Sequence, residues 1–244
     1  MDEFQWISGL IAVEAVIRAN SREVKAVLID EDRYDGPTAR ISQMAVRAGI
    51  PVSRVPTIQI DQHFPEGARG HVVAQVGPRR YQVLDALLSA DRPLVFLLDG
   101  VEDPYNFGQA VRSIYAAGVD GLVVPRRNWL SAAATVIRAS AGASEFLPTA
   151  VAETNEAVAS ARSHGLRVVV ATHANATPMH AADLTGAILM VVGGEKRGVA
   201  RPVMEAADLR VSIPYGRAFE YSLGTAAAAA VLAFECLSQR HRSP

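Results

Sequence analysis

The 244-residue sequence lacks the features that would place it outside the cell or in a membrane. Cys236 is the only cysteine, which excludes an intramolecular disulfide and favours a reducing compartment. No apolar run reaches the roughly 20 residues of a membrane-spanning helix, and the N-terminal stretch MDEFQWISG lacks the basic start of a signal peptide. We therefore expect a cytoplasmic protein without a membrane partner.

Aromatic residues and lysine are also scarce. Aromatic residues make up 6% of the chain and hydrophobic residues 50%, so the core is expected to be aliphatic. The six histidines show no metal-ligand spacing, so we expect no metal. Lysine occurs only at Lys25 and Lys196, and arginine is the better residue for bidentate phosphate contacts. The net charge of −1 neither supports nor excludes a nucleic-acid partner.

The pattern of apolar residues changes near residue 80 and predicts an α/β protein of two domains. Residues 1–78 alternate helical and strand signals and predict a small α/β domain with a modest core. Gly77-Pro78 marks the end of this small domain. A linker is expected over 79–92, and it is expected to contain a short helix over 83–88. A larger domain is expected over 93–244.

The larger domain shows a series of strand and helix signals. Several strands read as nearly continuous apolar runs, which is typical of parallel strands covered on both faces. The predicted strands are 94–98, 121–124, 166–171, 187–192 and 209–214, and an Ala-rich helix is predicted over 223–239. Alternating strands and helices predict a parallel sheet that binds ligands at the carboxyl ends of its strands.

The first unusual loop, DGVEDPYNFGQAVRSIYAAG, follows the predicted strand 94–98. Asn106 is expected to cap the next helix and Gly118 to end it. On a helical wheel of about 100° per residue, Arg112 lies at the margin of the apolar face, one turn beyond Gly108. Arg112 is then placed to act over the strand ends, or alternatively to form a surface ion pair with Glu102 or Asp103.

Two further loops follow predicted strands. GGEKRG, residues 193–198, has two leading glycines that permit positive φ and close approach of a ligand. The loop matches neither the GxxxxGK[ST] nor the GxGxxG phosphate-binding pattern. In the third loop, IPYGRAFEYSLG, Ser222 is expected to cap the last helix. Each loop alone is also consistent with ordinary turn chemistry.

Taken together, the three loops resemble the motifs of the SpoU (TrmH-like) branch of the SPOUT RNA methyltransferases. The order is D-G-V-x-D-P-x-N-x-G-x-x-x-R, then G-x-E-x-x-G-V, then I-P-(loop)-S-L before an Ala-rich helix. The resemblance covers 93–244 well, including SAGASEFLP from Ser140. Residues 1–78 more loosely resemble the small ribosomal-protein-like substrate-binding domain of that family.

The resemblance implies a fold, a reaction and a set of site residues. It implies a parallel-sheet SPOUT domain with a C-terminal trefoil knot, a homodimer with active sites at the interface, and methyl transfer from S-adenosylmethionine to a ribose 2′-hydroxyl of ribosomal or transfer RNA. The residues that match catalytic positions are Arg112, Asn106, Glu195 and Ser222. Those that match cofactor-binding positions are Thr172, Gly193, Gly194, Ile213, Ser222 and Leu223.

The sequence departs from the family pattern before the last helix. The family usually has S-L-N, whereas Gly224 and Thr225 follow Ser222-Leu223 here. Either Thr225 or Tyr221 compensates, or the acceptor differs, or the chain is an RNA-binding protein with an inactive methyltransferase fold. The retained catalytic positions favour the enzyme. Arginine keeps its proton in proteins, so the sequence favours Arg112 as a phosphate and oxyanion clamp over Arg112 as a base.

Overall fold

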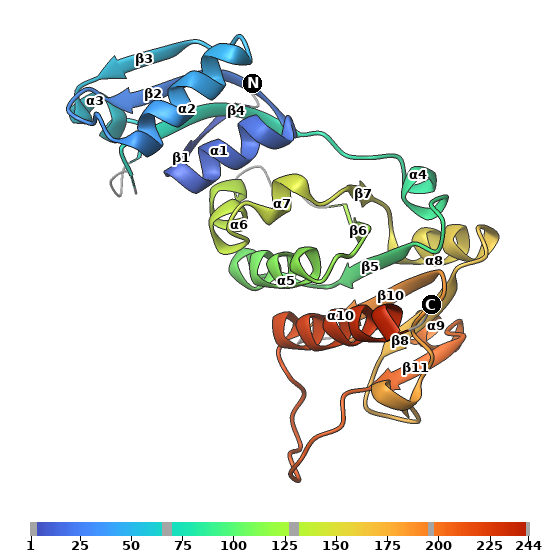
Figure 1. Ribbon diagram of the computed structural model, residues 1–244. Helices are drawn as coiled ribbons and strands as arrows, with labels where there is room; N and C mark the ends of the chain where they lie inside the picture. The colour runs from blue at the N-terminus through green and yellow to red at the C-terminus, as the bar shows by residue number, and fades with distance from the viewer. Residues whose placement is uncertain (1–3, 65–69, 127–131, 195–197, 243–244) are drawn as a thin grey trace. The chain divides into compact units, whose positions relative to one another are not determined.

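The computed structural model describes residues 4–64, 70–126, 132–194 and 198–242 (Figure 1). The chain forms two compact units. The first comprises Met1–Arg80 and Asn128–Phe146, and the second comprises Tyr81–Arg127 and Leu147–Pro244. The segment Asn128–Phe146 lies inside the larger predicted domain but belongs by its contacts to the first unit. The domain bounds 1–78, 79–92 and 93–244 stay a prediction.

The first unit is a four-stranded mixed sheet with helices, in the strand order β1-β4-β2-β3. Its strands are β1 (Gln5–Ser8), β2 (Arg22–Asp30), β3 (Val52–Val55) and β4 (Val72–Arg79). Its helices are α1 (Leu10–Ala19), α2 (Gly36–Arg47), α3 (Thr57–Asp61), α6 (Ala133–Ala139) and α7 (Ala143–Phe146). The core joins Val13 of α1, Val27 of β2 and Ile41 of α2 to Ile137 of α6.

The second unit is built on a seven-stranded sheet in the order β7-β6-β5-β10-β8-β11-β9, and every neighbouring pair is parallel. The strands are β5 (Leu94–Asp99), β6 (Gly121–Val124), β7 (Thr149–Val151), β8 (Arg167–Ala171), β9 (Thr177–Pro178), β10 (Ile188–Gly193) and β11 (Leu209–Ser212). The predicted parallel sheet is confirmed. The short strands β7 and β9 were not expected from the sequence.

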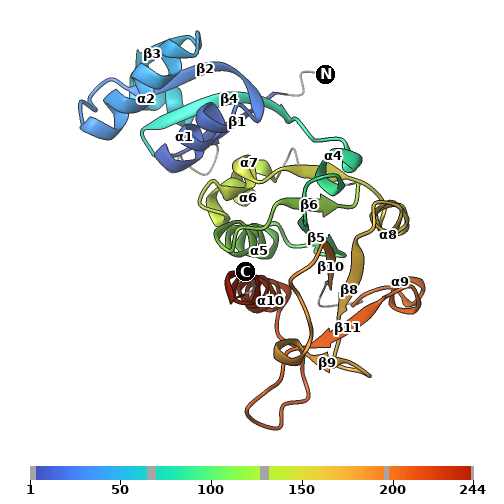
Figure 2. The same cartoon turned by 45° about the vertical axis from the view of Figure 1, so that its right-hand side comes forward.

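Helices lie on both faces of this sheet (Figures 1 and 2). Val95, Val168 and Leu189 pack with α4 (Leu84–Leu88), α8 (Thr154–Ser163) and α9 (Arg201–Glu205). On the other face, α5 (Pro104–Ala116) packs against α10 (Thr225–Arg242), and α10 also contacts β10. A short 3-10 helix, η1 (Met179–Ala181), follows β9. Cover on both faces explains why the strands read as continuous apolar runs.

The predicted helix caps of α5 and α10 are wrong in detail. Asp103, not Asn106, caps α5: its carboxylate accepts a hydrogen bond from the Asn106 backbone N–H at 2.7 Å, and Pro104 occupies the first turn. Gly118 ends the helix with φ 74°, as expected. Ser222 does not cap α10, because that helix begins only at Thr225.

The helix α10 buries one side of an Ala-rich sequence. Its buried residues include Ala229, Leu232, Ala233 and Cys236. Burial raises the pKa of the Cys236 thiol to about 12, so this side chain is a neutral packing group at physiological pH. In the sheet beneath, β10 lies between β5 and β8 although β8 precedes it in the chain. The trefoil knot that the resemblance implies stays a prediction.

Candidate cofactor and catalytic site

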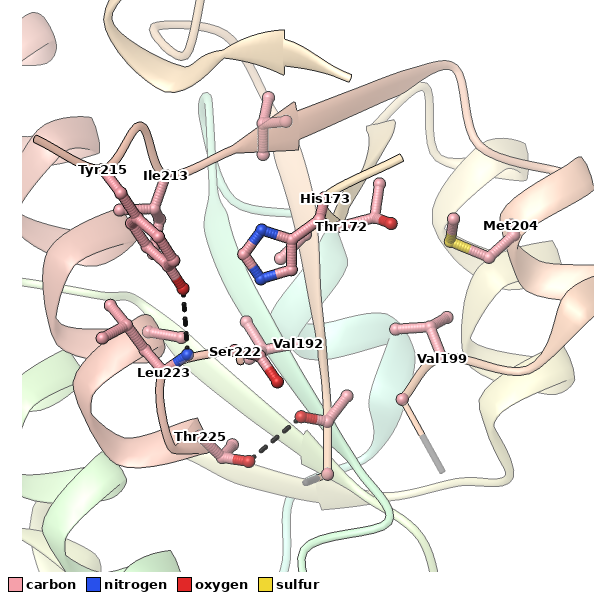
Figure 3. A pocket seen from close by; sticks show the side chains of 16 residues that line it. Thr172, His173, Val192, Val199, Met204, Ile213, Tyr215, Ser222, Leu223 and Thr225 are labelled. Carbon is pink, nitrogen blue, oxygen red and sulfur yellow. Dashed lines mark hydrogen bonds between the residues drawn. The ribbon is translucent and has the colours of Figure 1, made fainter. Parts of the chain in front are cut away.

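A cavity of about 310 Å³ opens at the carboxyl ends of β8, β10 and β11 (Figure 3). Ala171 ends β8, Val192 and Gly193 end β10, and Val211 lies near the end of β11. Ligands of open parallel sheets bind at this edge, and the volume lies at the lower end of the range typical of small-molecule sites, roughly 300–1,000 Å³.

The cavity gathers every residue that the sequence assigned to the cofactor. These residues come from the segments that follow β8, β10 and β11. They are Thr172, Gly193, Gly194, Ile213, Ser222 and Leu223. The lining is otherwise largely apolar, with Val199, Met204 and Ala228 among its members. Apolar walls with exposed backbone groups are suited to an aromatic heterocycle such as adenine.

The two leading glycines of the 193–198 loop are required by the packing of the chain itself, and not by the positive φ that the sequence suggested. Neither Gly193 nor Gly194 has positive φ; in this loop Gly198 does, at 61°. A Cβ on Gly193 would overlap the backbone of Gly198 and Val199, and a Cβ on Gly194 would overlap the carbonyl of Gly100. The close approach is therefore made by the chain itself, because the strand ends of β5 and β10 meet here backbone to backbone.

Replacing Gly194 by alanine is expected to weaken cofactor binding at least tenfold and to lower thermal stability. The added methyl group must displace the Gly100 backbone, and overpacking of this kind costs about 1–3 kcal/mol. Calorimetric titration with S-adenosylmethionine and a melting curve measure both effects. Gly186→Ala is the matched control, since a Cβ there meets nothing within 4 Å. Unchanged cofactor affinity in Gly194→Ala would contradict the assignment of this loop.

Two hydrogen bonds hold the first residue of α10 and the segment before that helix against the rest of the cavity (Figure 3). The Leu223 backbone N–H donates to the Tyr215 hydroxyl at 3.0 Å. The Thr225 hydroxyl donates to the Gly193 carbonyl at 3.1 Å and is buried. Of the two side chains considered as substitutes for the missing asparagine, Thr225 lines the cavity, whereas Tyr221 is 73% exposed and does not.

Sequence reasoning missed His173, Tyr215, Val199 and Met204 as lining residues. The signal was present for two of them, because His173 follows the end of β8 and Tyr215 follows the end of β11. Any residue one to three positions beyond a parallel strand lies at the binding edge. Val199 lies in the turn before α9 and Met204 lies on α9 itself, and no local pattern in the sequence indicates that either reaches the cavity.

The catalytic positions are not all gathered at this cavity. Ser222 lines it, whereas Arg112 and Asn106 lie on α5 outside its lining. Arg112 is exposed, and none of the hydrogen bonds or ion pairs between described residues involves it. The structure therefore does not contain the alternative surface ion pair between Arg112 and Glu102 or Asp103. Glu195 lies outside the described residues.

Within 4–64, 70–126, 132–194 and 198–242, no group of three or more His, Cys, Asp or Glu side chains could hold a metal ion. No helix in these ranges is long and apolar enough to cross a membrane.

Two family models match the chain and together span most of it. The model for the SpoU rRNA Methylase family covers residues 93–234, and the model for RNA 2′-O ribose methyltransferase substrate binding covers residues 6–82. The chain belongs to the SpoU rRNA methylase family. This confirms the resemblance seen in the sequence and the enzyme class it implied, an RNA 2′-O-methyltransferase.

Individual relatives cover the chain almost end to end. The 23S rRNA (guanosine-2′-O-)-methyltransferase RlmB of Pseudomonas aeruginosa is 32% identical over 247 residues, 98% of each chain. The RlmB of Xanthomonas axonopodis pv. citri is 34% identical over 248 residues, 97% of each chain. An AdoMet-bound rRNA methyltransferase from Sinorhizobium meliloti is 22% identical and superposes with a TM-score of 0.81 over 98% of this chain and 88% of that one. The predicted fold class is thereby confirmed.

Proposed function

We propose that this chain transfers the methyl group of S-adenosylmethionine to the 2′-hydroxyl of a guanosine in 23S ribosomal RNA. The donor is suggested by the family and by the AdoMet named in a structural relative. The acceptor is suggested by two relatives named as 23S rRNA guanosine-2′-O-methyltransferases, which match over nearly the whole chain. A ribosomal substrate agrees with the cytoplasmic location expected from the sequence.

The observation that carries the proposal is the convergence of three strand-end segments on one cavity. Gly193, Ile213 and Leu223 are far apart in the sequence and line the same space of about 310 Å³. These positions would hold S-adenosylmethionine through backbone groups, with Val192 and Ala228 against its apolar parts. When bound, the cofactor supplies an electrophilic methyl group on a sulfonium sulfur.

The protein must also activate the acceptor, since a ribose hydroxyl is a poor nucleophile. Arg112 is exposed at the surface of α5 and has no described ion pair, so its guanidinium is available to an RNA phosphate. In that position it would also stabilise negative charge developing on the 2′-oxygen. Its absence from the cavity lining is consistent with action on RNA instead of on the cofactor.

Two measurements on the full-length chain test the proposal. Calorimetric titration should show S-adenosylmethionine binding in the micromolar range or tighter. Incubation with tritiated cofactor and unmodified 23S rRNA transcript should place label on one guanosine, located by nuclease digestion. Binding of the cofactor without transfer to 23S rRNA, but with transfer to tRNA, would keep the enzyme class and overturn the substrate.

The alternative, an inactive RNA-binding protein, rests on Gly224 in place of the family asparagine. The buried Thr225 hydroxyl argues against this alternative. Thr225 follows Gly224 directly, lines the cavity and donates a hydrogen bond to the Gly193 carbonyl at the end of β10, so a polar group is present next to the position of the missing asparagine. RNA binding without cofactor binding in the titration would favour the alternative.

We propose that the active form is a homodimer. Large apolar side chains remain exposed on the two helices that cover one face of the sheet: Tyr105 and Tyr115 on α5, and Phe234 on α10. Light scattering at micromolar concentration is expected to give about twice the 26.0 kDa chain mass. Phe234→Arg should shift the mass toward the monomer, because a charge at an apolar interface is strongly unfavourable. A wild-type monomer would contradict the proposal.

We also propose that residues 1–78 bind RNA, which is consistent with the substrate-binding family model over residues 6–82. A deletion at residue 78 is a poor test. Ile137 of α6 packs in the core of the first unit and Glu145 of α7 is buried there, so the deletion would remove the partners of both. Substitutions at exposed positions of this unit, with cofactor affinity as the control, separate RNA binding from folding.

A further inference from the structure

A series of aromatic rings leads from the cofactor cavity to the surface of the second unit. His173 and Tyr215 line the cavity, and their ring centroids are 5.5 Å apart. Tyr215 is followed by Phe219 at 6.0 Å, and Phe219 by Tyr221 at 5.6 Å. We call these four side chains the aromatic ladder. Its inner end touches the cavity and its outer end is open, since Phe219 is 57% and Tyr221 73% exposed.

The position of the ladder is unusual for this chain. Aromatic residues make up only 6% of the sequence, yet Tyr215, Phe219 and Tyr221 all fall within one short loop. That loop joins β11 to α10, and in Figures 1 and 2 it extends away from the sheet. The two outer rings meet edge to face, at an interplanar angle of 62°, so neither ring is stacked flat on the other. Folding and core packing do not account for them.

Charge does not explain the loop either. Arg217 and Glu220 are both exposed in it and balance one another, so the distinctive chemistry at the outer end is the planar π-surface. Exposed rings next to a nucleic-acid site stack on unpaired bases. Sequence-specific recognition of RNA mostly targets single-stranded loops and bulges, whose unstacked bases are free to stack on aromatic side chains.

We propose that Phe219 and Tyr221 stack on an unpaired RNA base adjacent to the nucleotide that is methylated. This rests on the proposed function, which supplies the RNA, and adds the groups that position it. The aromatic ladder connects the cofactor cavity to the proposed stacking surface. The Tyr215 ring contacts Phe219, and the Tyr215 hydroxyl accepts a hydrogen bond from the Leu223 backbone N–H at the cavity. These residues are positioning residues and leave the chemistry of transfer unchanged.

The test separates stacking from every other contact by using two probes with the same backbone. One is a labelled ten-nucleotide oligoadenylate, and the other is an abasic oligoribose phosphate of the same length. The full-length chain is expected to bind the oligoadenylate more tightly in fluorescence anisotropy. Phe219→Leu and Tyr221→Leu should each weaken this binding about tenfold, within the range for loss of one stacked base, and leave binding of the abasic probe unchanged.

Conservative variants serve as matched controls. Phe219→Tyr and Tyr221→Phe keep a ring at each position and should retain the affinity for oligoadenylate. The affinity of the leucine variants for the cofactor should match wild type. If the cofactor binds but the oligoadenylate does not bind through stacking, the stacking inference fails while the proposed function stands. Equal weakening of both probes, or no weakening of either, would overturn the inference. So would a loss of cofactor affinity, which would make the loop a cofactor lid, or a change in oligomeric mass, which would make it a contact between copies.

Discussion

Replacing Arg112 by alanine is expected to lower the rate of methyl transfer about 10²–10³-fold while cofactor affinity and melting temperature stay near wild type. Removing a charge that stabilises a developing oxyanion typically costs about 2.7–4 kcal/mol of transition-state stabilisation. Arg112 has no ion pair or hydrogen bond among the described residues, so little folding free energy depends on it. It also lies outside the lining of the cofactor cavity.

A second exposed arginine provides the contrast. Arg162 on α8 binds the Asp208 carboxylate at 2.5 Å and the Ala206 carbonyl at 2.7 Å. Arg162→Ala should cost at most about 1 kcal/mol of stability, the usual value of a surface pair, and leave the transfer rate unchanged. Arg112→Ala is thus expected to lower the transfer rate but not the stability, and Arg162→Ala to lower the stability slightly but not the transfer rate.

Single-turnover transfer to 23S rRNA transcript, cofactor titration and thermal melting provide the three readouts. Arg112→Lys keeps the charge but lacks the planar fork, so it should recover only part of the rate. An Arg112→Ala enzyme with full activity and a melting temperature several degrees lower would show that the residue is structural.

The sheet and its binding edge could be predicted from the sequence because both are local in origin. A run such as Leu94 to Leu98 is apolar at every position since helices cover both faces of β5. The residues just beyond such strands reach the same edge by geometry alone. Thr172, Gly193 and Ile213 therefore line one cavity, as the resemblance to the family motifs implied.

The remaining differences between the sequence-based predictions and the structure arise where the local sequence is compatible with more than one conformation. Asp103 and Asn106 are both good capping residues, and only the position of Pro104 in the first turn decides for Asp103. Strands of two or three residues, such as β9 and β7, carry too little pattern to be recognised. Gly194 lines the cavity, but the group that excludes a side chain at this position is the Gly100 carbonyl of another loop.

The association of Asn128–Phe146 with the first unit could not be predicted from local pattern. Besides the core residue Ile137, it involves Glu145, whose partners Ser21 and Arg22 lie more than a hundred residues earlier in the chain. Nothing near Glu145 in the sequence indicates a buried cation. A carboxylate that is only 1% exposed must nevertheless have one, since an unpaired buried charge is strongly unfavourable.

Replacing Glu145 by alanine is therefore expected to destabilise the first unit by about 3–5 kcal/mol, the usual cost of breaking a buried ion pair. Arg22 Nε and Nη2 donate to the two carboxylate oxygens at 2.9 and 3.2 Å, and the Ser21 hydroxyl donates at 2.5 Å. Without the carboxylate, the buried Arg22 guanidinium keeps its hydrogen bond to the Gly77 carbonyl but loses its charged partner. Arg40→Ala, which removes a surface partner of Glu14, should cost at most about 1 kcal/mol.

The same ion pair predicts how stability depends on pH. Burial acts to raise the pKa of Glu145, but the charge and hydrogen bonds of Arg22, with Arg79 and Ser21, outweigh it and leave the pKa lowered. A carboxylate with a lowered folded pKa contributes its full stabilisation above the unfolded value, about 4.3, and loses it as pH falls through the folded value. The contribution should be constant from pH 7 to about pH 5 and decline below that.

Urea unfolding followed by tryptophan fluorescence measures both effects on this unit. The chain has two tryptophans, so a Trp129→Phe background leaves Trp6 of β1 as the sole reporter. The difference in unfolding free energy between this background and its Glu145→Ala derivative should be large at pH 7 and shrink in the acid range, because protonation removes the pair from the parent as well. A difference below 1 kcal/mol at pH 7 would show that the pair contributes no net stability, and a difference that persists undiminished at pH 3 would show that the carboxylate acts through packing instead of charge.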